Sequence, residues 1–305
     1  MIIAPGYIGI DVSKNHLDIF DGTAHRIANT PEAIAALLRG LDAPRLVLFE
    51  ATGRYDRLLQ RELQRAGIGF ARVNPLHARA FARATGQLAK TDRIDARLLA
   101  AMAQALTPEP QPPADPERQE LVELHRRRAQ LVGFRQQERT RQHIASASIA
   151  PGIASHLSWL DTQISALEQQ IEVLIRRSAA LSLAASLLRT VPGIGPVTAV
   201  ALIALMPELG QRSGKTIAAL GGLAPINRDS GQYRGQRSIA GGRAEVRKAL
   251  YMAAVTASRT ASRFSNSYAD LTERGKAPKS ALIAVARKLL VTANAILKSG
   301  QPFNA

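Results

Sequence analysis

The sequence has 305 residues, no cysteine, and a formal net charge of +16 at pH 7. The absence of cysteine excludes disulfides, thiolate zinc sites and cysteine nucleophiles. Such a charge calls for a polyanionic partner, and the lack of a basic amphipathic tail or lipidation signal favours nucleic acid over a membrane surface.

The first hundred residues alternate strand and helix patterns. A turn at 21–23 predicts a hairpin, and Thr30 before Pro31 is a typical helix start. The resulting order βββαβαβα is that of a ribonuclease H-like α/β domain. The predicted strands are Tyr7–Val12, Leu17–Phe20, His25–Ile27, Arg45–Phe49 and Gly69–Val73, and the predicted helices are Pro31–Arg39, Tyr55–Ala66 and Pro75–Thr85.

Four acidic residues in this region predict a metal site. Asp11 and Glu50 each end a short apolar run, and Asp92 and Asp95 lie in the first turns of another predicted helix. A spacing of three puts the last two carboxylates on one helix face. Carboxylate oxygens are the ligands that Mg²⁺ prefers, although such acids can also simply end strands or complement a helix dipole. We favour metal binding because all four occur together, and we expect a fifth carboxylate, Asp18, to face away.

A proline-rich stretch divides the chain. Five prolines between residues 107 and 116 cannot continue a helix and predict a linker. We therefore expect an α/β domain at 1–107, a linker and helical middle at 108–187, and a mostly helical C-terminal domain at 188–305. The fold class is α/β plus all-α.

Apolar residues spaced by three and four after the linker predict an amphipathic helical hairpin or coiled coil. The tip of this hairpin is expected near Ala150–Gly152. Its first arm is strongly basic, which suggests contact with RNA or DNA. The arginines of this arm are Arg126, Arg127, Arg128, Arg135, Arg139 and Arg141.

The segment Val191–Pro196 resembles the turn of a helix-hairpin-helix motif. Gly193 and Gly195 would let backbone N–H groups approach a DNA phosphate, assisted by the N-terminus of the next helix. An ordinary turn between helices is the alternative. The net charge of the chain favours DNA contact.

A glycine-rich tract at Leu220–Arg243 could cradle phosphates with backbone N–H groups and guanidinium groups. A serine there, such as Ser230, could act as a nucleophile because cations stabilise its alkoxide. From the residues alone, however, a serine before a glycine is most often part of a turn. The arginines of the tract are Arg228, Arg234, Arg237 and Arg243, and Arg247 and Lys248 follow on the next predicted helix.

Taken together, these segments resemble a known family, the DEDD transposases of insertion sequence 110, which are related to the Piv-type DNA invertases. Its first block is similar to Gly9–Lys14, Phe49–Gly53, Val73–Pro75 and Lys90–Ala96. Its second block is similar to Pro192–Gly195, Gly222–Pro225, Ser230–Gly231 and Arg247–Leu250. The resemblance covers nearly the whole chain.

The resemblance implies a DNA transposase or site-specific recombinase with a RuvC-like N-terminal domain. It implies that Asp11, Glu50, Asp92 and Asp95 bind Mg²⁺, and that a serine of the C-terminal domain forms a covalent phosphoserine link to DNA. The family motif maps this serine to Ser230, with Ser238 as the neighbouring alternative. The resemblance further implies a tetramer, a dimer of dimers joined through the coiled-coil arms, and a bridge RNA that pairs with donor and target DNA.

Three alternatives stay open. A metal-only nuclease, such as a Holliday-junction resolvase, needs the acidic residues but no serine. An invertase of the related branch needs no RNA. A non-catalytic nucleic-acid scaffold needs neither the acidic residues nor the serine.

The sequence also bears on localisation. The N-terminus lacks a basic segment followed by a cleavage site, and apolar runs such as Pro196–Met206 are too short to span a bilayer. We therefore expect a cytoplasmic, bacterial protein without a membrane partner.

Overall fold

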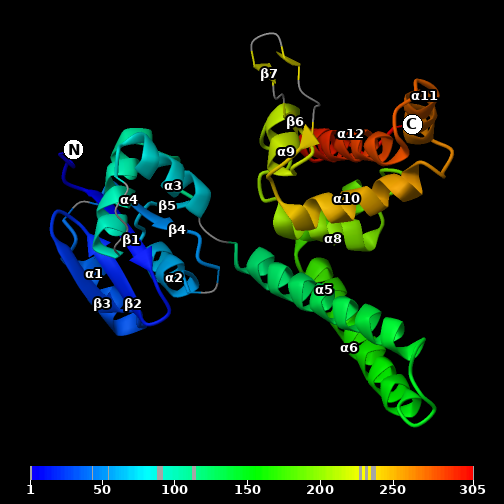
Figure 1. The fold of residues 1–305 in the computed structure, drawn as a ribbon, viewed down its shortest axis with the longest axis horizontal. Coiled ribbons are helices and arrows are strands. Elements are labelled where there is room, and N and C mark those ends of the chain that lie inside the picture. The colour runs from blue at the N-terminus through cyan, green and yellow to red at the C-terminus, as the bar shows by residue number, and fades with distance from the viewer. Residues whose placement is uncertain are drawn as a thin grey trace. The chain divides into compact units, whose positions relative to one another are not determined.

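The computed structural model describes residues 2–42, 44–53, 55–87, 92–111, 115–226, 229–230, 233–234 and 238–304, with backbone alone for 92–94, 229–230 and 233–234. The chain forms two compact units, Met1–Ala114 and Asp115–Ala305. Figure 1 shows a sheet flanked by helices in the first unit and mostly helices in the second.

The first unit is built on a five-stranded mixed sheet with strand order β3-β2-β1-β4-β5. The first three strands form an antiparallel meander, while β4 and β5 run parallel to β1. The carboxyl ends of β1 and its parallel neighbour β4 therefore lie at the same edge of the sheet. The strands are β1 (Tyr7–Val12), β2 (His16–Phe20), β3 (Ala24–Ala28), β4 (Leu46–Glu50) and β5 (Phe70–Val73).

Helices cover both faces of this sheet because the central strands are apolar on both faces. One face of the sheet packs on α1 and α2 in one buried cluster, and the other packs on α3 and α4 in a second. Thr30 caps α1, accepting a hydrogen bond from the Ala33 N–H (3.4 Å), as the sequence predicted. The helices are α1 (Pro31–Gly40), α2 (Arg57–Arg65), α3 (Pro75–Ala84) and α4 (Asp92–Leu106).

The predicted order of elements is confirmed for this unit, and most boundaries agree within two residues. The mixed sheet with helices on both faces is consistent with a ribonuclease H-like domain. The order of elements could be predicted because apolar runs and helix starts are local signals, whereas the pairing of β1 with β4, which are not consecutive strands, is not a local signal.

The second unit begins with two long antiparallel helices, α5 (Pro116–Gln142) and α6 (Ala150–Arg177), which pack along each other. A small separate cluster of Leu131, Leu160 and Ile164 fills part of the seam. The hairpin is confirmed, but its tip, expected near Ala150–Gly152, lies a few residues earlier. The turn lies at residues 143–149, and Pro151 falls in the first turn of α6, where its missing N–H has no helical partner to lose.

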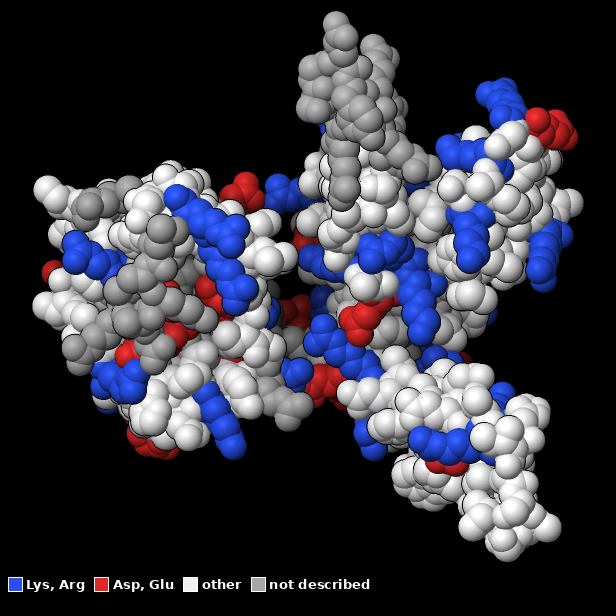
Figure 2. All heavy atoms as spheres, viewed as in Figure 1, with Lys and Arg blue, Asp and Glu red and all other residues white. Residues whose placement is uncertain are grey.

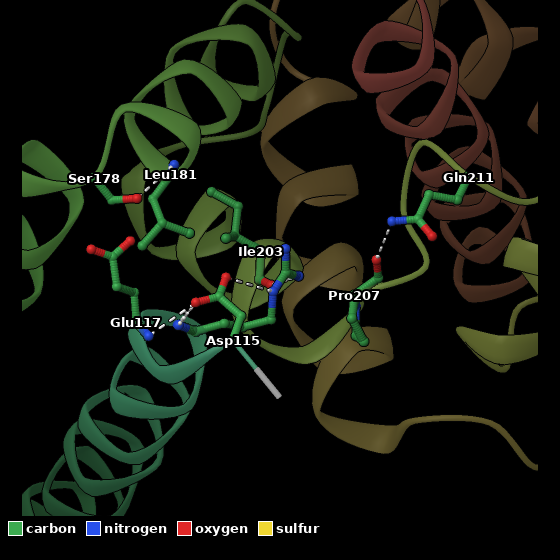
Figure 3. A network of polar contacts seen from close by, with 8 residues as sticks. Asp115, Glu117, Ser178, Leu181, Ile203, Pro207 and Gln211 are labelled. Atoms are coloured by element: carbon green, nitrogen blue, oxygen red, sulfur yellow. Dashed lines mark hydrogen bonds and ion pairs between the residues drawn. The ribbon is translucent and has the colours of Figure 1, made fainter. Parts of the chain in front are cut away.

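The start of α5 is tied to the rest of this unit (Figure 3). Asp115 accepts hydrogen bonds from the backbone N–H groups of Glu117 (3.0 Å) and Arg118 (3.3 Å), which caps the helix. The Arg118 guanidinium donates to the Ile203 carbonyl (2.7 Å). The helix is therefore anchored at its first turn.

The remainder of the second unit is a helical core built mainly from leucine, isoleucine, valine and alanine. Two short strand pairs, β6–β9 and β7–β8, stand in the glycine-rich tract. The helices are α7 (Ala179–Arg189), α8 (Pro196–Leu205), α9 (Gly214–Leu220), α10 (Ala244–Ala257), α11 (Arg263–Glu273) and α12 (Pro278–Ser299). The strands are β6 (Pro225–Ile226), β7 (Asp229–Ser230), β8 (Tyr233–Arg234) and β9 (Ser238–Ile239).

Helix α12 is long and apolar enough to cross a membrane by length and composition, the only such helix in the described part of the chain. A closing helix from about Ser280 to Leu297 is predicted from the sequence, and α12 (Pro278–Ser299) confirms it. Its inward side chains, among them Val285, Leu289 and Leu290, are fully buried in the core of the second unit, and Arg287 and Lys288 lie near its middle. The apolar content of α12 is accounted for by this core.

Candidate active site

Asp11 and Glu50 lie at one edge of the sheet. Ile10 of β1 is paired with Phe49 of β4, so the next residue on each strand is one of these acids. Both side chains are half-buried. The predicted meeting of two strand-end carboxylates therefore agrees with the strand register.

The two carboxylates also share a face of the sheet. Ile8 and Ile10 pack on the side of α1 and α2, so Asp11 points to the side of α4. By the same alternation, Leu48 packs on the α4 side, and Glu50 follows it two residues later. Asp11 and Glu50 thus lie on neighbouring strands, at one end and on one face.

Helix α4 packs directly on β1 at this face. A Cβ atom on Gly9 would lie 1.9 Å from the Ala96 carbonyl oxygen and 2.4 Å from the Ala100 nitrogen, so only glycine permits this approach. Near the other end of the helix, the Gln104 side chain accepts a hydrogen bond from the Ala4 N–H (2.6 Å), before β1 begins. The helix therefore runs antiparallel to β1.

This direction brings the N-terminal turns of α4 towards the edge where Asp11 stands. Asp92 and Asp95 are in those turns, and Asp95 is half-buried. The side chain of Asp92 lies outside the described residues. The signal for this packing was the glycine inside an apolar strand, which typically marks the close approach of another backbone.

Asp18 does not face away, so that expectation is wrong. It lies directly opposite Asp11 in the antiparallel β1–β2 pair, and side chains of opposed residues point to the same face. Its carboxylate is only 4% exposed and receives two hydrogen bonds from Arg26, at 2.9 and 2.8 Å. Arg26 lies opposite Asp18 on β3, so the charge of Asp18 is balanced within the sheet.

The donor set suits a hard divalent cation. Within the described residues, no three acidic, histidine or cysteine side chains form a group that could hold an ion, and the predicted ligand Asp92 is outside that set. Asp11, Glu50 and Asp95 offer carboxylate oxygens, which Mg²⁺ and Ca²⁺ prefer over nitrogen or sulfur. These three side chains come from two strands and one helix, and by themselves they do not form such a group.

The glycine-rich tract of the second unit is anchored at its base. Gly222 and Gly242 have φ values of +66° and +63°, and a Cβ on Gly242 would lie 2.2 Å from the Gly222 nitrogen. The Arg247 guanidinium donates to the Gly241 carbonyl (2.8 Å) and to the Gly222 carbonyl (3.5 Å). Arg247 thus holds the two ends of the tract together, a role that its sequence position alone did not show.

The two candidate serines occupy short strands. The backbone of Ser230 lies in β7, paired with Tyr233 of β8. Ser238 lies in β9, paired with Ile226, and is exposed. The residues Arg228 and Arg237 lie outside the described part of the chain, as do the side chains of Ser230 and Arg234.

Arg243 is engaged inside the unit. Its guanidinium makes a two-point ion pair with Glu208, at 2.7 and 2.6 Å. Burial raises the pKa of Glu208, but the hydrogen bonds and charge of Arg243 outweigh burial and hold that pKa below its ordinary value. Arg243 therefore links the start of α10 to the loop after α8.

The arginines of α5 differ in their surroundings. Arg128 pairs with Glu168 of α6 (2.6 Å), and Arg126 lies 3.8 Å from Glu245 of α10. Arg127 donates to the Gln130 side chain (3.3 Å) and is exposed. Figure 2 shows blue side chains distributed over the surface of both units rather than confined to this arm.

The turn between α7 and α8 uses its two glycines differently. Gly193 has φ +88°, and a Cβ there would lie 2.5 Å from the Ala253 carbonyl oxygen of α10, so this glycine is needed for packing. Gly195 is exposed, has no atom near its Cβ position, and precedes the first turn of α8. Of the two, Gly195 is the one open to a ligand.

Comparison with known proteins gives matches in both units. Residues 8–147 match the DEDD transposase family of IS110, and residues 185–269 match the family described as transposase IS116/IS110/IS902. Two pilin gene-inverting proteins, from Moraxella lacunata and Moraxella bovis, are each 32% identical over 317 positions, covering 98% of this chain and 97% of theirs. An uncharacterised 43.6 kDa protein of insertion element IS110 from Streptomyces coelicolor is 29% identical over 155 residues, covering 50% of this chain and 37% of that protein.

Proposed function

Because this chain belongs to the insertion sequence 110 family of DEDD transposases and is a DNA recombinase, we propose that it cuts and rejoins DNA through a metal-dependent phosphoserine mechanism. One observation carries the proposal. Asp11 and Glu50 end neighbouring parallel strands on one face, and α4 brings the turns with Asp92 and Asp95 towards that edge.

The family uses a divalent metal, which we propose is Mg²⁺, held by Asp11, Glu50, Asp92 and Asp95. A bound Mg²⁺ would neutralise charge on the scissile phosphate. The chain's part would be to hold these carboxylates in place at the end of the sheet.

We propose Ser230 as the nucleophile, with Ser238 as the alternative. The serine oxygen would form a bond to phosphorus as one bond from phosphorus to a sugar oxygen breaks, and the serine proton would end on the departing sugar hydroxyl. The number of phosphoester bonds stays constant, so religation by the reverse step needs no energy-rich cofactor. In support, Arg247 anchors the base of the tract that carries this serine through the carbonyls of Gly222 and Gly241.

The remaining site residues are proposed as nucleic-acid contacts. The Gly195 turn would contact a DNA backbone as in a helix-hairpin-helix motif, and the basic arm of α5 would contact DNA or RNA. Because Arg126, Arg128 and Arg243 also have carboxylate partners, we expect smaller losses of binding when these are changed. The proposed set is Arg126, Arg127, Arg128, Gly193, Gly195, Arg228, Arg234, Arg237 and Arg243.

We further propose the assembly and partners of the family for this chain. These are donor and target DNA, a bridge RNA, a dimer of dimers joined by coiled-coil arms from α5 and α6, and a cytoplasmic location. The domain limits 1–107, 108–187 and 188–305 belong to the same proposal.

A second candidate function is inversion of a DNA segment without RNA. The relatives that cover almost the whole chain are named pilin gene-inverting proteins, which favours this branch. The discriminating observation is whether recombination survives ribonuclease treatment. Dependence on RNA supports the bridge-RNA function, and indifference to ribonuclease supports inversion.

Strand cleavage tests the proposed metal site. The full chain would be incubated with DNA from the ends of its own element, with and without RNA transcribed from the flanking sequence, in Mg²⁺ or EDTA. We expect Asp11→Asn and Glu50→Gln to reduce cleavage by about a hundredfold or more, while Glu32→Gln, an exposed acid at the start of α1, leaves it unchanged. Full cleavage by Asp11→Asn would contradict the proposal.

A further inference from the structure

A pocket of about 570 Å³ lies between α11 and α12, and its lining includes none of the candidate active-site residues. Three of its lining side chains are cations, namely Arg263 from α11 and Arg287 and Lys288 from α12. Its lining contains no carboxylate. Three positive charges around one pocket repel one another, and a bound anion would relieve that repulsion.

The surrounding sequence supplies no internal counter-charge. Residues 274–305 contain six lysines and arginines and no aspartate or glutamate. Within the described part of the chain, none of the three pocket cations forms an ion pair with a carboxylate. They differ in this from Arg126, Arg128 and Arg243, which all have carboxylate partners. Figure 2 shows blue side chains outnumbering red ones over the region of α11.

Two of the cations are already held in position. The Arg263 guanidinium lies over the rings of Phe303 (4.4 Å) and Phe264 (5.3 Å) and donates to the Thr292 hydroxyl (3.2 Å). The Lys288 ammonium donates to the Ser267 hydroxyl (2.8 Å). Their partners are neutral, so the full charge of each cation is kept while its freedom is reduced, and less entropy is lost on binding an anion.

The C-terminal segment forms part of this arrangement. The Phe303 N–H donates to the Thr190 hydroxyl (2.9 Å), and its ring stacks on Phe264 at 5.9 Å. Phe264 is buried in the core. The aromatic support under Arg263 is thus fixed to the folded unit rather than to a free terminus.

We propose that this pocket binds the phosphate backbone of a nucleic-acid strand. A guanidinium fork and an ammonium group are the usual ligands of phosphate oxygens, and the half-buried apolar side chains of Ala284 and Val291 can contact the sugar face. The volume is in the range of sites that hold one or two nucleotide units. The inference rests on the proposed function and extends it to a contact remote in sequence from Ser230. DNA and RNA share this chemistry.

The test is equilibrium binding of the full chain in EDTA, which separates binding from catalysis. Fluorescein-labelled 30-base-pair DNA and 30-nucleotide RNA would each be titrated over a range of salt concentrations. The pocket variant is Arg263→Gln with Arg287→Gln and Lys288→Gln. The matched control is Arg274→Gln with Lys279→Gln and Lys298→Gln, which removes the same charge from exposed positions outside the pocket.

We expect the pocket variant to bind nucleic acid at least about tenfold more weakly than the unaltered protein near 0.15 M salt. The slope of log binding constant against log salt concentration for DNA should become smaller in magnitude by about 2 to 3, and both changes should be smaller in the control. Loss for DNA alone, or for RNA alone, would identify the strand that occupies the pocket. Equal losses in pocket and control variants would overturn the proposal.

Two further measurements guard against misfolding and against confusion with the proposed function. Arg287→Gln with Lys288→Gln keeps the Arg263–Phe303 stack and should still lose about fivefold or more in affinity. In the unaltered protein, nucleic acid should protect Lys288 from acetylation more than Lys279, and equal protection would also overturn the site. If the unaltered protein cleaves DNA but the pocket variant binds nucleic acid with unchanged affinity, only the pocket inference fails. If the pocket variant loses affinity but the unaltered protein does not cleave DNA, only the proposed function fails.

Discussion

Gly9 controls how close α4 comes to the sheet, and so where its acidic turns lie. No side chain fits between β1 and α4 at this point, because an added Cβ would overlap the Ala96 carbonyl oxygen. The same strand carries Asp11 two residues later, on the same face. The position of one glycine is therefore coupled to the geometry of the candidate metal site.

We predict that Gly9→Ala destabilises the first unit by about 3 kcal/mol, because the overlap forces α4 away from the sheet. Hydrogen exchange of the full chain should rise in peptides from β1 and α4, and cleavage should fall with it. The control is Gly40→Ala, where a Cβ meets nothing within 4 Å. Unchanged exchange in Gly9→Ala would contradict the close packing.

His125 makes the stability of the second unit depend on pH. Burial is the main cause that lowers its pKa, opposed by Glu245 and assisted by Arg128 and Arg126. Its Nδ1 atom is buried without a hydrogen-bond partner. The unfolded chain therefore binds a proton at higher pH than the folded chain does, and stability must fall as pH drops below about 6.5.

We predict that urea midpoints of the unaltered protein decrease between pH 7 and pH 5.5, and that His125→Gln makes this decrease smaller. The variant also loses packing, so the comparison is of pH dependence and not of absolute stability. His143→Gln, at an exposed position, should keep the full decrease. A pH dependence in His125→Gln equal to that of the unaltered protein would rule out this origin.

At the scale of single residues, the candidate acidic residues could be identified from the sequence, but the ion pairs of the neighbouring charged residues could not. Asp11 and Glu50 could be identified because each ends an apolar run, which is a local pattern. The orientation of Asp18 depends on strand register and on Arg26 of the neighbouring strand. Arg243 finds Glu208 35 residues earlier, a pairing that only the packing of α10 against the preceding helices creates.

Among the elements, the α5–α6 hairpin has little apolar support of its own. Its outer part is held by the cluster of Leu131, Leu160 and Ile164, separate from the main core, and by ion pairs such as Arg135 with Asp161 (2.7 Å). Ion pairs at partly exposed positions contribute little, so the apolar seam must supply most of the stability.

We predict that Leu160→Ala costs about 2 to 4 kcal/mol locally, because it removes a buried side chain from a small cluster. Hydrogen exchange should rise in the outer halves of α5 and α6 while α8 and α12 stay protected. Val173→Ala, at an exposed position of α6, is the matched control. Global unfolding of the second unit in Leu160→Ala would contradict a separate cluster.

The hairpin also shows where prediction of elements from sequence fails. Proline and glycine at 151–152 suggested the turn, yet proline is accepted in the first turn of a helix, and the helix begins one residue earlier. The residues that do form the turn, 143–149, lack proline and glycine, so no local signal distinguished them. The order of strands and helices in the first unit was predictable because its turns and helix starts carry characteristic residues, such as Thr30 before Pro31.

On the scale of the whole molecule, the chain consists of two units with separate cores joined through a proline-rich segment. The acidic residues lie in the first unit, and both candidate serines lie in the second. The proposed chemistry needs the carboxylates of the first unit and a serine of the second. The central claim is therefore that a carboxylate of one unit and a serine of the other contribute to a single reaction.

Detection of a covalent protein–DNA adduct tests this claim most directly. The full chain would be incubated with Mg²⁺, labelled DNA from the element ends and the flanking RNA, and then separated on a denaturing gel. We predict an adduct in the unaltered protein and in Ser238→Ala, and its loss in Ser230→Ala and in Asp11→Asn. Strand cleavage without an adduct, dependent on Asp11 and indifferent to both serines, would contradict the account and indicate a metal-only nuclease.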